Sequence, residues 1–357
     1  MTSSSDTAIV DGHLDLAENA TLFSRDLTRE IEDIRMREKR QTNEATVSLP
    51  ELERGGIAVA LATVTPGFLV EDVGSDFEPR SALYRTAEEA EANALRQIAL
   101  YERWEREGRV RLIKSSSDLE DHVRMWREDR KIGLVLLMEG ADPIVQTADL
   151  PRWWERGLRM IGLTYGDTKY GAGVAGGSTS PKSGGLTEAG FELLHAMGEQ
   201  GFIWDISHLT EEGIWQGLAL DFPRVCASHA NAQALIPTNR HLSDKVIHAV
   251  AEKKGVIGLV LYNAFLEPRW RDDKTVPVSL KDHVRRQAAY IAGLAGWDVV
   301  GIGSDLDGGF GRRECPTEID TIADLYKVGE VVPDEAREAV LSGNWLNFLR
   351  RSLPQQA

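Results

Sequence analysis

The stretch Ile132-Gly-Leu-Val-Leu-Leu-Met-Glu-Gly140 decides the fold predicted for this 357-residue chain. Residues 132–138 form an apolar run with no polar interruption, which is typical of a strand buried on both faces of a parallel sheet. A carboxylate, Glu139, follows the run directly. The same arrangement, a short apolar run with an ionisable residue at or just past its C-terminal end, recurs along the chain.

Short apolar runs alternate with longer amphipathic segments, which predicts parallel strands connected by helices. Eight strands over about 300 residues favour an α/β fold of the closed (β/α)8 TIM-barrel type, and an open doubly wound sheet is the main alternative. The predicted strands are Ala8–Gly12, Ile57–Thr63, Ile132–Met138, Leu158–Leu163, Phe202–Ile206, Val225–Ala227, Val256–Tyr262 and Val299–Ile302, with Val110–Ile113 as a possible addition. The predicted helices are Thr86–Glu107, Ser117–Glu128, Thr187–Glu199, Glu211–Leu220, Ser243–Lys253, Leu280–Ala295 and a closing helix within Pro333–Ser352.

No Pro/Ser/Gly-rich linker divides the chain, so we expect one domain over residues 1–357. The glycine-rich stretch Gly171–Gly185 lies between a predicted strand and a predicted helix, as a long loop on the active face would. Its first part, Gly171-Ala-Gly-Val-Ala-Gly176, matches the dinucleotide-binding pattern G-x-G-x-x-G. That pattern requires a strand directly before it and a helix starting at its end, and Gly177-Ser-Thr-Ser-Pro181 follows instead. We therefore expect no dinucleotide here.

Composition excludes several classes of protein. The net charge of −15 argues against nucleic-acid binding, which needs a basic face. No apolar run approaches the ~18 residues of a membrane span, and the polar start of the chain does not resemble a signal peptide. Two cysteines are too few for a disulfide framework. We expect a soluble, cytoplasmic protein that binds no membrane. A homodimer is a further expectation if aromatic residues such as Trp153 and Trp154 are exposed, whereas a helix packed on the barrel would bury them.

Histidines and carboxylates gather at the ends of the predicted strands. In a barrel these ends form one ring around the mouth where active sites are built. Alone, a histidine at a strand end is more often structural than a ligand, and Asp305-Leu-Asp-Gly308 alone is usually a turn. Several strand ends that all supply such groups instead favour a metal centre with nitrogen and oxygen ligands, suited to Zn²⁺ or a related ion. The residues are His13, Asp15, Glu139, His208, His229 and Asp305.

Three of these positions have a further geometric meaning. His13 and Asp15 are alternate residues of an extended segment and can point at one centre. Glu139 could bridge two metal ions ~3.5–4 Å apart, the spacing used in two-metal hydrolysis. His122, His195, His248 and His283 fall within predicted helices and are expected to be structural.

Several motifs together resemble the membrane (renal) dipeptidase family of zinc peptidases, which belongs to the amidohydrolase-like barrels. Their order and spacing extend through most of the chain and are specific only in combination. The motifs are Asp11-Gly-His-Leu-Asp15, Ser48-Leu-Pro-Glu-Leu-Glu-Arg-Gly-Gly56, Met138-Glu-Gly140, Arg159-Met-Ile-Gly-Leu-Thr164, Asp205-Ile-Ser-His208, Ala227-Ser-His229, Asn239-Arg240 and Gly301-Ile-Gly-Ser-Asp-Leu-Asp-Gly308.

The resemblance implies a role for each matched position. His13, Asp15 and Glu139 would hold one zinc ion. Glu139, His208 and His229 would hold a second, so Glu139 would bridge two Zn²⁺ per chain. Asp305 would be the acid/base, and Arg240 would bind the carboxylate of the substrate. Without the resemblance, Arg240 could equally form a loop ion pair.

Two positions depart from the pattern of the family. Tyr165 follows Leu163-Thr164 where many members have a histidine that polarises the scissile carbonyl. A phenol can donate a hydrogen bond to an oxyanion but normally stays neutral. The first motif continues Leu16-Ala-Glu18 where members often have Pro-Trp, which alters a wall of the pocket. These departures affect the substrate rather than the metals.

The resulting hypothesis is a zinc metallopeptidase that hydrolyses dipeptides, including those with a D-residue at the C-terminal side, through a zinc-bridging hydroxide. Asp305 would transfer the proton and Tyr165 would support the oxyanion. The alternative is a hydrolase, lyase or tailoring enzyme of the same fold acting on another small amide-like metabolite. A non-catalytic binding protein is disfavoured because every expected ligand position is filled.

Overall fold

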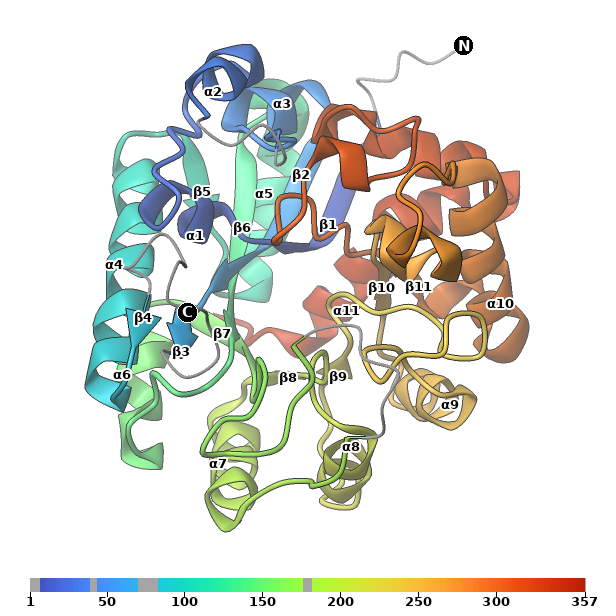
Figure 1. Cartoon of the computed structure of the whole chain (residues 1–357). Coiled ribbons are helices and arrows are strands. Elements are labelled where there is room, and N and C mark those ends of the chain that lie inside the picture. Colours follow the sequence, from blue (N-terminus) through green and yellow to red (C-terminus); the bar gives the residue numbers. More distant parts are fainter. Residues whose placement is uncertain (1–6, 39–43, 70–82, 176–181, 357) are drawn as a thin grey trace.

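The computed structural model describes residues 7–38, 44–69, 83–175 and 182–356 (Figure 1). Nine of the described strands form one parallel sheet, and the short strands β3 (Phe68–Leu69) and β4 (Leu83–Tyr84) pair with each other separately. The strands of the large sheet are β1 (Ile9–Leu14), β2 (Ile57–Val64), β5 (Val110–Leu112), β6 (Ile132–Glu139), β7 (Leu158–Gly162), β8 (Ile203–Asp205), β9 (Val225–Cys226), β10 (Ile257–Leu259) and β11 (Val300–Ile302).

The sheet closes into a barrel. Its strands follow the order β10-β11-β1-β2-β6-β7-β8-β9, and an isolated parallel bridge between Ala227 and Ile257 joins the two ends. Strand β5 pairs with the first half of β6 and β7 pairs with the second half, so β5 lies outside the eight-stranded path. The (β/α)8 prediction is confirmed, and the open sheet is wrong.

Helices surround the strands and lie between successive strands in sequence (Figure 1). Several begin at a serine or threonine whose side chain accepts from a backbone amide in the first turn, which satisfies a donor that helical hydrogen bonds leave free. These N-caps are Thr86, Ser115, Thr187, Thr210 and Ser243. The helices are α1 (Leu16–Thr21), α2 (Ile31–Arg37), α3 (Leu49–Arg54), α4 (Ala87–Arg106), α5 (Ser116–Asp129), α6 (Leu150–Glu155), α7 (Glu188–Gln200), α8 (Glu211–Leu218), α9 (Asp244–Glu252), α10 (Arg285–Ala295) and α11 (Asn344–Ser352).

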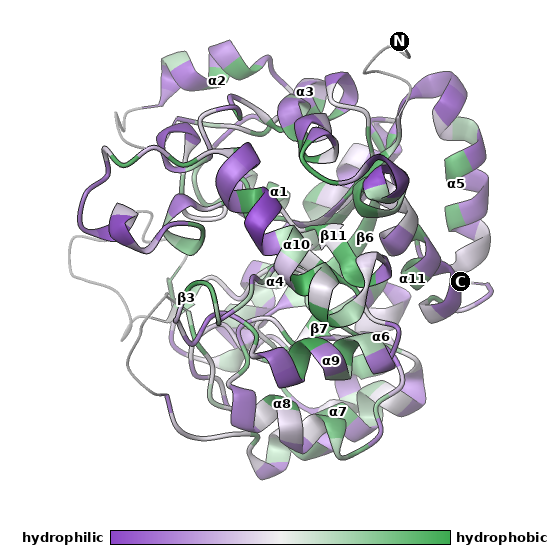
Figure 2. Ribbon diagram, turned by 90° about the vertical axis from the view of Figure 1, so that its right-hand side faces the viewer, coloured by the Kyte–Doolittle hydropathy of each residue, from purple (hydrophilic) through white to green (hydrophobic). Residues whose placement is uncertain are grey.

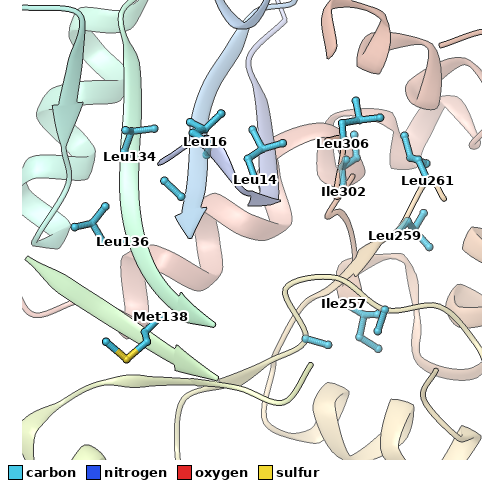
Figure 3. Packing of buried hydrophobic residues seen from close by; sticks show 14 of the residues in the cluster. Leu14, Leu16, Leu134, Leu136, Met138, Ile257, Leu259, Leu261, Ile302 and Leu306 are labelled. Carbon is cyan, nitrogen blue, oxygen red and sulfur yellow. The ribbon is translucent and has the colours of Figure 1, made fainter. Parts of the chain in front are cut away.

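Two hydrophobic clusters divide the strand residues by face. Leu134, Leu136 and Met138 of β6 belong to a large cluster that also contains helix residues (Figure 3). Val135 and Leu137 alternate with them and belong to a smaller cluster that draws residues from β1, β2, β7, β8 and β9 and from helices α5 and α11. Because successive side chains of a strand point to opposite faces, the strand residues of the smaller cluster fill the barrel, and those of the larger one lie beneath the helices. Figure 2 shows the contrast between hydrophobic β6 inside and the more hydrophilic α5 outside.

The structure differs from the sequence prediction mainly at element boundaries. Strand β1 extends to Leu14, whereas β10 is shorter than the predicted Val256–Tyr262. The predicted helix Leu280–Ala295 begins with a π-helical turn over Leu280–Val284, and the closing region Pro333–Ser352 has a π-helical turn before α11. Short helices α1, α2, α3 and α6 were not predicted.

The two adjacent tryptophans do not form an exposed surface. Trp153 is 1% exposed, and Trp154 packs edge-on against Phe202 beneath the guanidinium of Arg159. Of the two alternatives, the structure shows a helix packed on the barrel, and a homodimer stays a prediction without support from these tryptophans. Among the described residues, no helix is both long and apolar enough to cross a membrane.

Candidate metal centre

Three imidazoles converge on one carboxylate at the mouth of the barrel. Oε1 of Glu139, the last residue of β6, lies 3.0 Å from Nε2 of His208. It lies 3.5 Å from Nε2 of His13 in β1 and 3.5 Å from Nε2 of His229, which follows β9. All four residues are buried. Residues of β1 and β6 and residues that follow β8 and β9 thus meet at one oxygen, as expected for the C-terminal ends of parallel barrel strands.

The cluster continues on the side of β1. Oδ1 of Asp15 lies 3.6 Å from Nε2 of His13 and accepts a 2.5 Å hydrogen bond from the hydroxyl of Thr63. Ligand atoms of His13, Asp15 and Asp305 lie within 4.8 Å of one another, and so do those of His13, Glu139 and His229. The structure therefore brings together all six strand-end residues that the sequence singled out.

The donor set fits a bound metal ion. Nε2 of His13 is buried and has no hydrogen-bond partner among the described residues. Nε2 of His208 and Nε2 of His229 face each other at 2.9 Å. Buried polar atoms are normally paired, and nitrogen lone pairs directed at one point are satisfied by a shared cation.

A buried network holds two of the imidazoles in the tautomer that a metal requires. The hydroxyl of Ser228 donates to Asp205 Oδ2 (2.5 Å), so its lone pairs accept from Nδ1 of His13 (3.1 Å) and Nδ1 of His229 (2.8 Å). With the proton on Nδ1, each Nε2 presents a free lone pair. The carboxylate of Asp205 is fixed in turn by the hydroxyl and amide of Ser207.

The third imidazole is oriented by the glycine-rich loop. Nδ1 of His208 donates to the carbonyl of Val174 (2.7 Å), and the amide of Val174 donates back to the carbonyl of His208 (2.7 Å). A Cβ on Gly173 would lie 2.0 Å from the carbonyl oxygen of Gly166, so only glycine allows this approach. No helix begins within residues 171–175, and residues 176–181, where the helix of a dinucleotide motif would start, lie outside the described residues.

Two residues of the cluster have strained backbones. His208 (φ 64°) and Asp305 (φ 60°) are among the few non-glycine described residues with left-handed conformations. Such conformations cost about 1–3 kcal/mol and gather at functional sites. Both turns carry a side chain from a strand end back over the mouth of the barrel.

The electrostatics of the cluster show an excess of negative charge. Burial opposes protonation of His13, but Glu139 and Asp15 overcome it and raise its pKa to about 10, so without a bound cation a proton occupies the Nε2 position that a metal ion would take. Burial likewise opposes ionisation of Glu139, but His13 and His208 lower its pKa to about 2. The pKa values of His208 and His229 are lowered, chiefly by burial, so both rings are neutral and able to bind a metal.

Asp305 is a carboxyl group of this cluster that resists ionisation. Burial raises its pKa well above the usual range, and the charges of Asp15 and Glu139 raise it further, against the opposing effect of His13. Two residues later, Asp307 anchors the loop: its carboxylate accepts from the amide and hydroxyl of Thr46 and from the amide of Val47. The segment Asp305–Gly308 is therefore a turn in which the second aspartate, Asp307, has a structural role.

Arg240 and Tyr165 border the cluster. The guanidinium of Arg240 donates to Nε2 of His208 (3.0 Å) and to the carbonyl of His229 (2.9 Å). The ring of Tyr165 lies 4.7 Å from that of His208. Although 37% of Tyr165 is exposed, desolvation of its hydroxyl and then the charge of Glu139 raise its pKa, so the phenol stays protonated. Both residues line a cavity of about 340 Å³ that also reaches Glu139 and Asp305.

The sequence did not reveal the supporting roles of Asp205 and Ser228. Each lies inside a motif that was noted for its histidine, and neither was assigned a function. The sequence does contain a signal for Asp205. Its carboxylate lies within the apolar run Phe202–Ile206, and a carboxylate buried there needs hydrogen-bond donors that are also buried.

A parallel barrel with histidines and carboxylates clustered at its mouth defines a metal-dependent hydrolase. The model of the membrane dipeptidase family (peptidase family M19) matches residues 4–351. The chain belongs to this family and is a metallopeptidase by that membership.

Individual relatives agree with the assignment. An uncharacterized protein in the pqqA 5′ region of Klebsiella pneumoniae is 31% identical over 249 residues, covering 68% of this chain and 88% of that protein. The crystal structure of dipeptidase AC, a family M19 metallopeptidase, has 26% identity and a TM-score of 0.77 and covers 98% of this chain and 99% of its own. A metallopeptidase from Rhodobacter sphaeroides, solved with a phosphinate mimic of L-Ala-D-Ala, has 24% identity and a TM-score of 0.78 over 97% of this chain and 99% of its own; this similarity concerns the fold.

Proposed function

We propose that this protein hydrolyses the peptide bond of dipeptides at a centre of two zinc ions. The observation that carries the proposal is the convergence of three imidazole nitrogens on Oε1 of Glu139, with Asp15 and Asp305 beside them. His13 and Asp15 would hold one ion, His208 and His229 the other, and Glu139 would bridge them. The whole chain would act as one hydrolase domain.

The chemistry divides between the bound ions and the side chains. Two zinc ions, when bound, would supply a hydroxide nucleophile at neutral pH and polarise the scissile carbonyl. Asp305 would accept the proton of the attacking water and deliver it to the leaving amine. Its raised pKa supports this role, because a carboxyl that resists ionisation can carry a proton between two steps.

Arg240 and Tyr165 would position the substrate. Arg240 would bind a free C-terminal carboxylate by two parallel hydrogen bonds, which would restrict the enzyme to short substrates. Tyr165, protonated and partly exposed in the cavity, would donate to the oxygen that becomes negative during attack. Because the family often has a histidine there, the hydroxyl would supply a hydrogen bond without a positive charge.

The test is hydrolysis of a panel of dipeptides covering both stereochemistries at each position, measured with zinc-loaded and chelator-treated protein. We expect cleavage that includes dipeptides with a D-residue at the C-terminal side, about two zinc ions per chain by metal analysis, and loss of activity on chelation that added zinc restores. Full activity in a metal-free preparation would refute the proposal. Loaded protein that cleaves none of the panel would also contradict it.

A second candidate is a different reaction of another small amide-like metabolite at the same centre. Tyr165 and Glu18 favour it, because both line the cavity where many family members have other residues. If the loaded protein binds two metals but cleaves no dipeptide, this candidate takes precedence.

A further inference from the structure

Glu18 brings a fourth carboxyl group into the substrate cavity. It lies in α1, one helical turn after Asp15, and lines the same cavity as Glu139, Tyr165 and Asp305. Only 9% of Glu18 is exposed. The hydroxyl of Thr65, a neutral group, interacts with its carboxyl group and lowers its pKa. A buried carboxylate is normally paired with a cation, so its position facing a substrate cavity calls for an explanation.

Glu18 and Arg240 line the same cavity but interact with different residues of the proposed metal centre. Glu18 interacts electrostatically with Asp15, Glu139 and His13, the residues proposed for one ion. Arg240 contacts His208 and His229, which are proposed for the other ion. Glu139 links the two sets of residues because its Oε1 approaches His13, His208 and His229 alike. The cavity therefore offers both a negative group and a positive group.

This arrangement complements a dipeptide that carries both of its terminal charges. With the carboxylate at Arg240 and the scissile carbonyl at the centre, the ammonium group would point toward Glu18. An ammonium beside two divalent ions is repelled by them, so a nearby carboxylate would stabilise it strongly in a site shielded from water. Burial, together with the charges of Asp15 and Glu139, raises the pKa of Glu18 against the opposing effects of His13 and the hydroxyl of Thr65.

We propose that Glu18 determines specificity by binding the free α-ammonium group of the substrate, so that the enzyme requires unblocked dipeptides. The proposal rests on the proposed dipeptidase function and identifies the substrate class more closely. It uses a residue of this chain that replaces the tryptophan often found in the family. Glu18 is not assigned to the metal ions: neither the group of His13, Glu139 and His229 nor the group of His13, Asp15 and Asp305 contains it, and no contact is seen between its carboxyl group and a proposed ligand nitrogen among the described residues.

The test compares two substrates that differ only in the amino group: an alanyl-alanine stereoisomer that the wild type cleaves, and the corresponding N-propionyl-alanine. Both would be assayed with zinc-loaded wild type and with Glu18→Gln, which keeps the shape and removes the charge. We expect the wild type to prefer the dipeptide by roughly 30-fold in kcat/KM. In Glu18→Gln the preference should fall to about threefold or less, chiefly through a higher KM for the dipeptide.

Controls separate a role in specificity from roles in folding and metal binding. Glu32→Gln makes the same chemical change at an exposed position of α2 and should leave the preference unchanged. Glu18→Gln should retain its zinc content and melting temperature, and Glu18→Ala provides a second variant that should show the same loss of preference if Gln disturbs the fold.

The possible outcomes distinguish the role of Glu18 from the proposed dipeptidase function. An unchanged preference in both Glu18 variants would overturn the proposal while leaving the dipeptidase function intact. Loss of zinc in Glu18→Gln would also overturn it, because Glu18 would then be a metal ligand. Wild type that cleaves neither substrate and no other dipeptide would refute the dipeptidase function, and the role of Glu18 with it.

Discussion

Asp205 and Ser228 are joined by two hydrogen bonds, from the backbone amide of Ser228 to Oδ1 (2.8 Å) and from its hydroxyl to Oδ2 (2.5 Å). This pairing fixes the rotamer of Ser228 and turns its lone pairs toward His13 and His229. One hydroxyl group therefore orients imidazoles proposed for two different metal ions.

Replacing Ser228 with alanine should weaken metal binding at both sites. Without the acceptor, the rings of His13 and His229 lose the hydrogen bond that fixes their tautomer, and loss of such a partner typically costs 10–100-fold in metal affinity. Zinc affinity would be measured by competition with a chelator. Ser342→Ala, at another buried serine that bonds only to a helix carbonyl, is the matched control. Equal affinities in the two variants would contradict the role of Ser228.

Replacing Asp305 with asparagine should abolish turnover and leave the metals bound. The amide keeps the size of the side chain but cannot carry the proton, and general acid–base catalysis typically contributes ~10²–10⁴-fold. Steady-state rates and zinc content would be measured on the same preparation. A rate close to that of the wild type would remove Asp305 from the reaction, and loss of zinc would reassign it as a ligand.

Replacing Tyr165 with phenylalanine tests the proposed oxyanion donor. Because the phenol is protonated, the substitution removes one hydrogen bond and no charge, and we expect kcat to fall by about 100-fold with little change in KM. Activity within about twofold of the wild type would show that Tyr165 only forms part of the cavity wall.

Replacing Arg240 with lysine should impair recognition of the C-terminal carboxylate. Lysine keeps the charge but cannot make two parallel hydrogen bonds, so KM for the dipeptide should rise about tenfold or more. The comparison substrate is the same dipeptide with a C-terminal amide, for which wild type and variant should differ little. An equal loss with both substrates would indicate that Arg240 acts instead through its contacts with His208 and His229.

Replacing Gly173 with alanine should disturb His208 from outside the metal centre. The added Cβ would meet the carbonyl oxygen of Gly166 at 2.0 Å, so the loop carrying Val174 must shift, at a cost of about 1–3 kcal/mol. We expect a lower melting temperature and weaker binding of one zinc ion. Gly293→Ala serves as a control, because no atom lies within 4 Å of its added Cβ; identical behaviour of the two variants would contradict this link.

Much of the fold followed from the sequence because the strands are buried on both faces. An apolar run such as Ile132–Met138 is unambiguous, and its end marks where Glu139 emerges. Short helices such as α1 and α6 were missed because six residues contain too few turns to show a periodic pattern. The π-helical turn at Leu280–Val284 has the same apolar pattern as an α-helix and could not be distinguished.

The candidate ligands also followed from the sequence, whereas their supporting partners did not. The strand ends predict which side chains face the mouth of the barrel, so the sequence alone identifies His13, Glu139 and His229 as candidate ligands. The contact between Asp205 and Ser228 depends on the register of β8 against β9, where Asp205 pairs with Cys226. Register between parallel strands is set by the helices that connect them, and a single sequence does not encode it in a readable pattern.

Metal binding should stabilise the barrel where it closes, at the isolated bridge between Ala227 and Ile257. The barrel closes at this seam without a continuous ladder, and His229 lies just beyond it on the β9 side. Metal ions held jointly by His229, Glu139 and His13 would act as a cross-link that ties the β9 edge to β6 and β1. Hydrogen exchange at the amides of Ala227 and Gly258, both of which bond across the seam, should therefore accelerate on zinc removal more than exchange within the β2–β6 ladder.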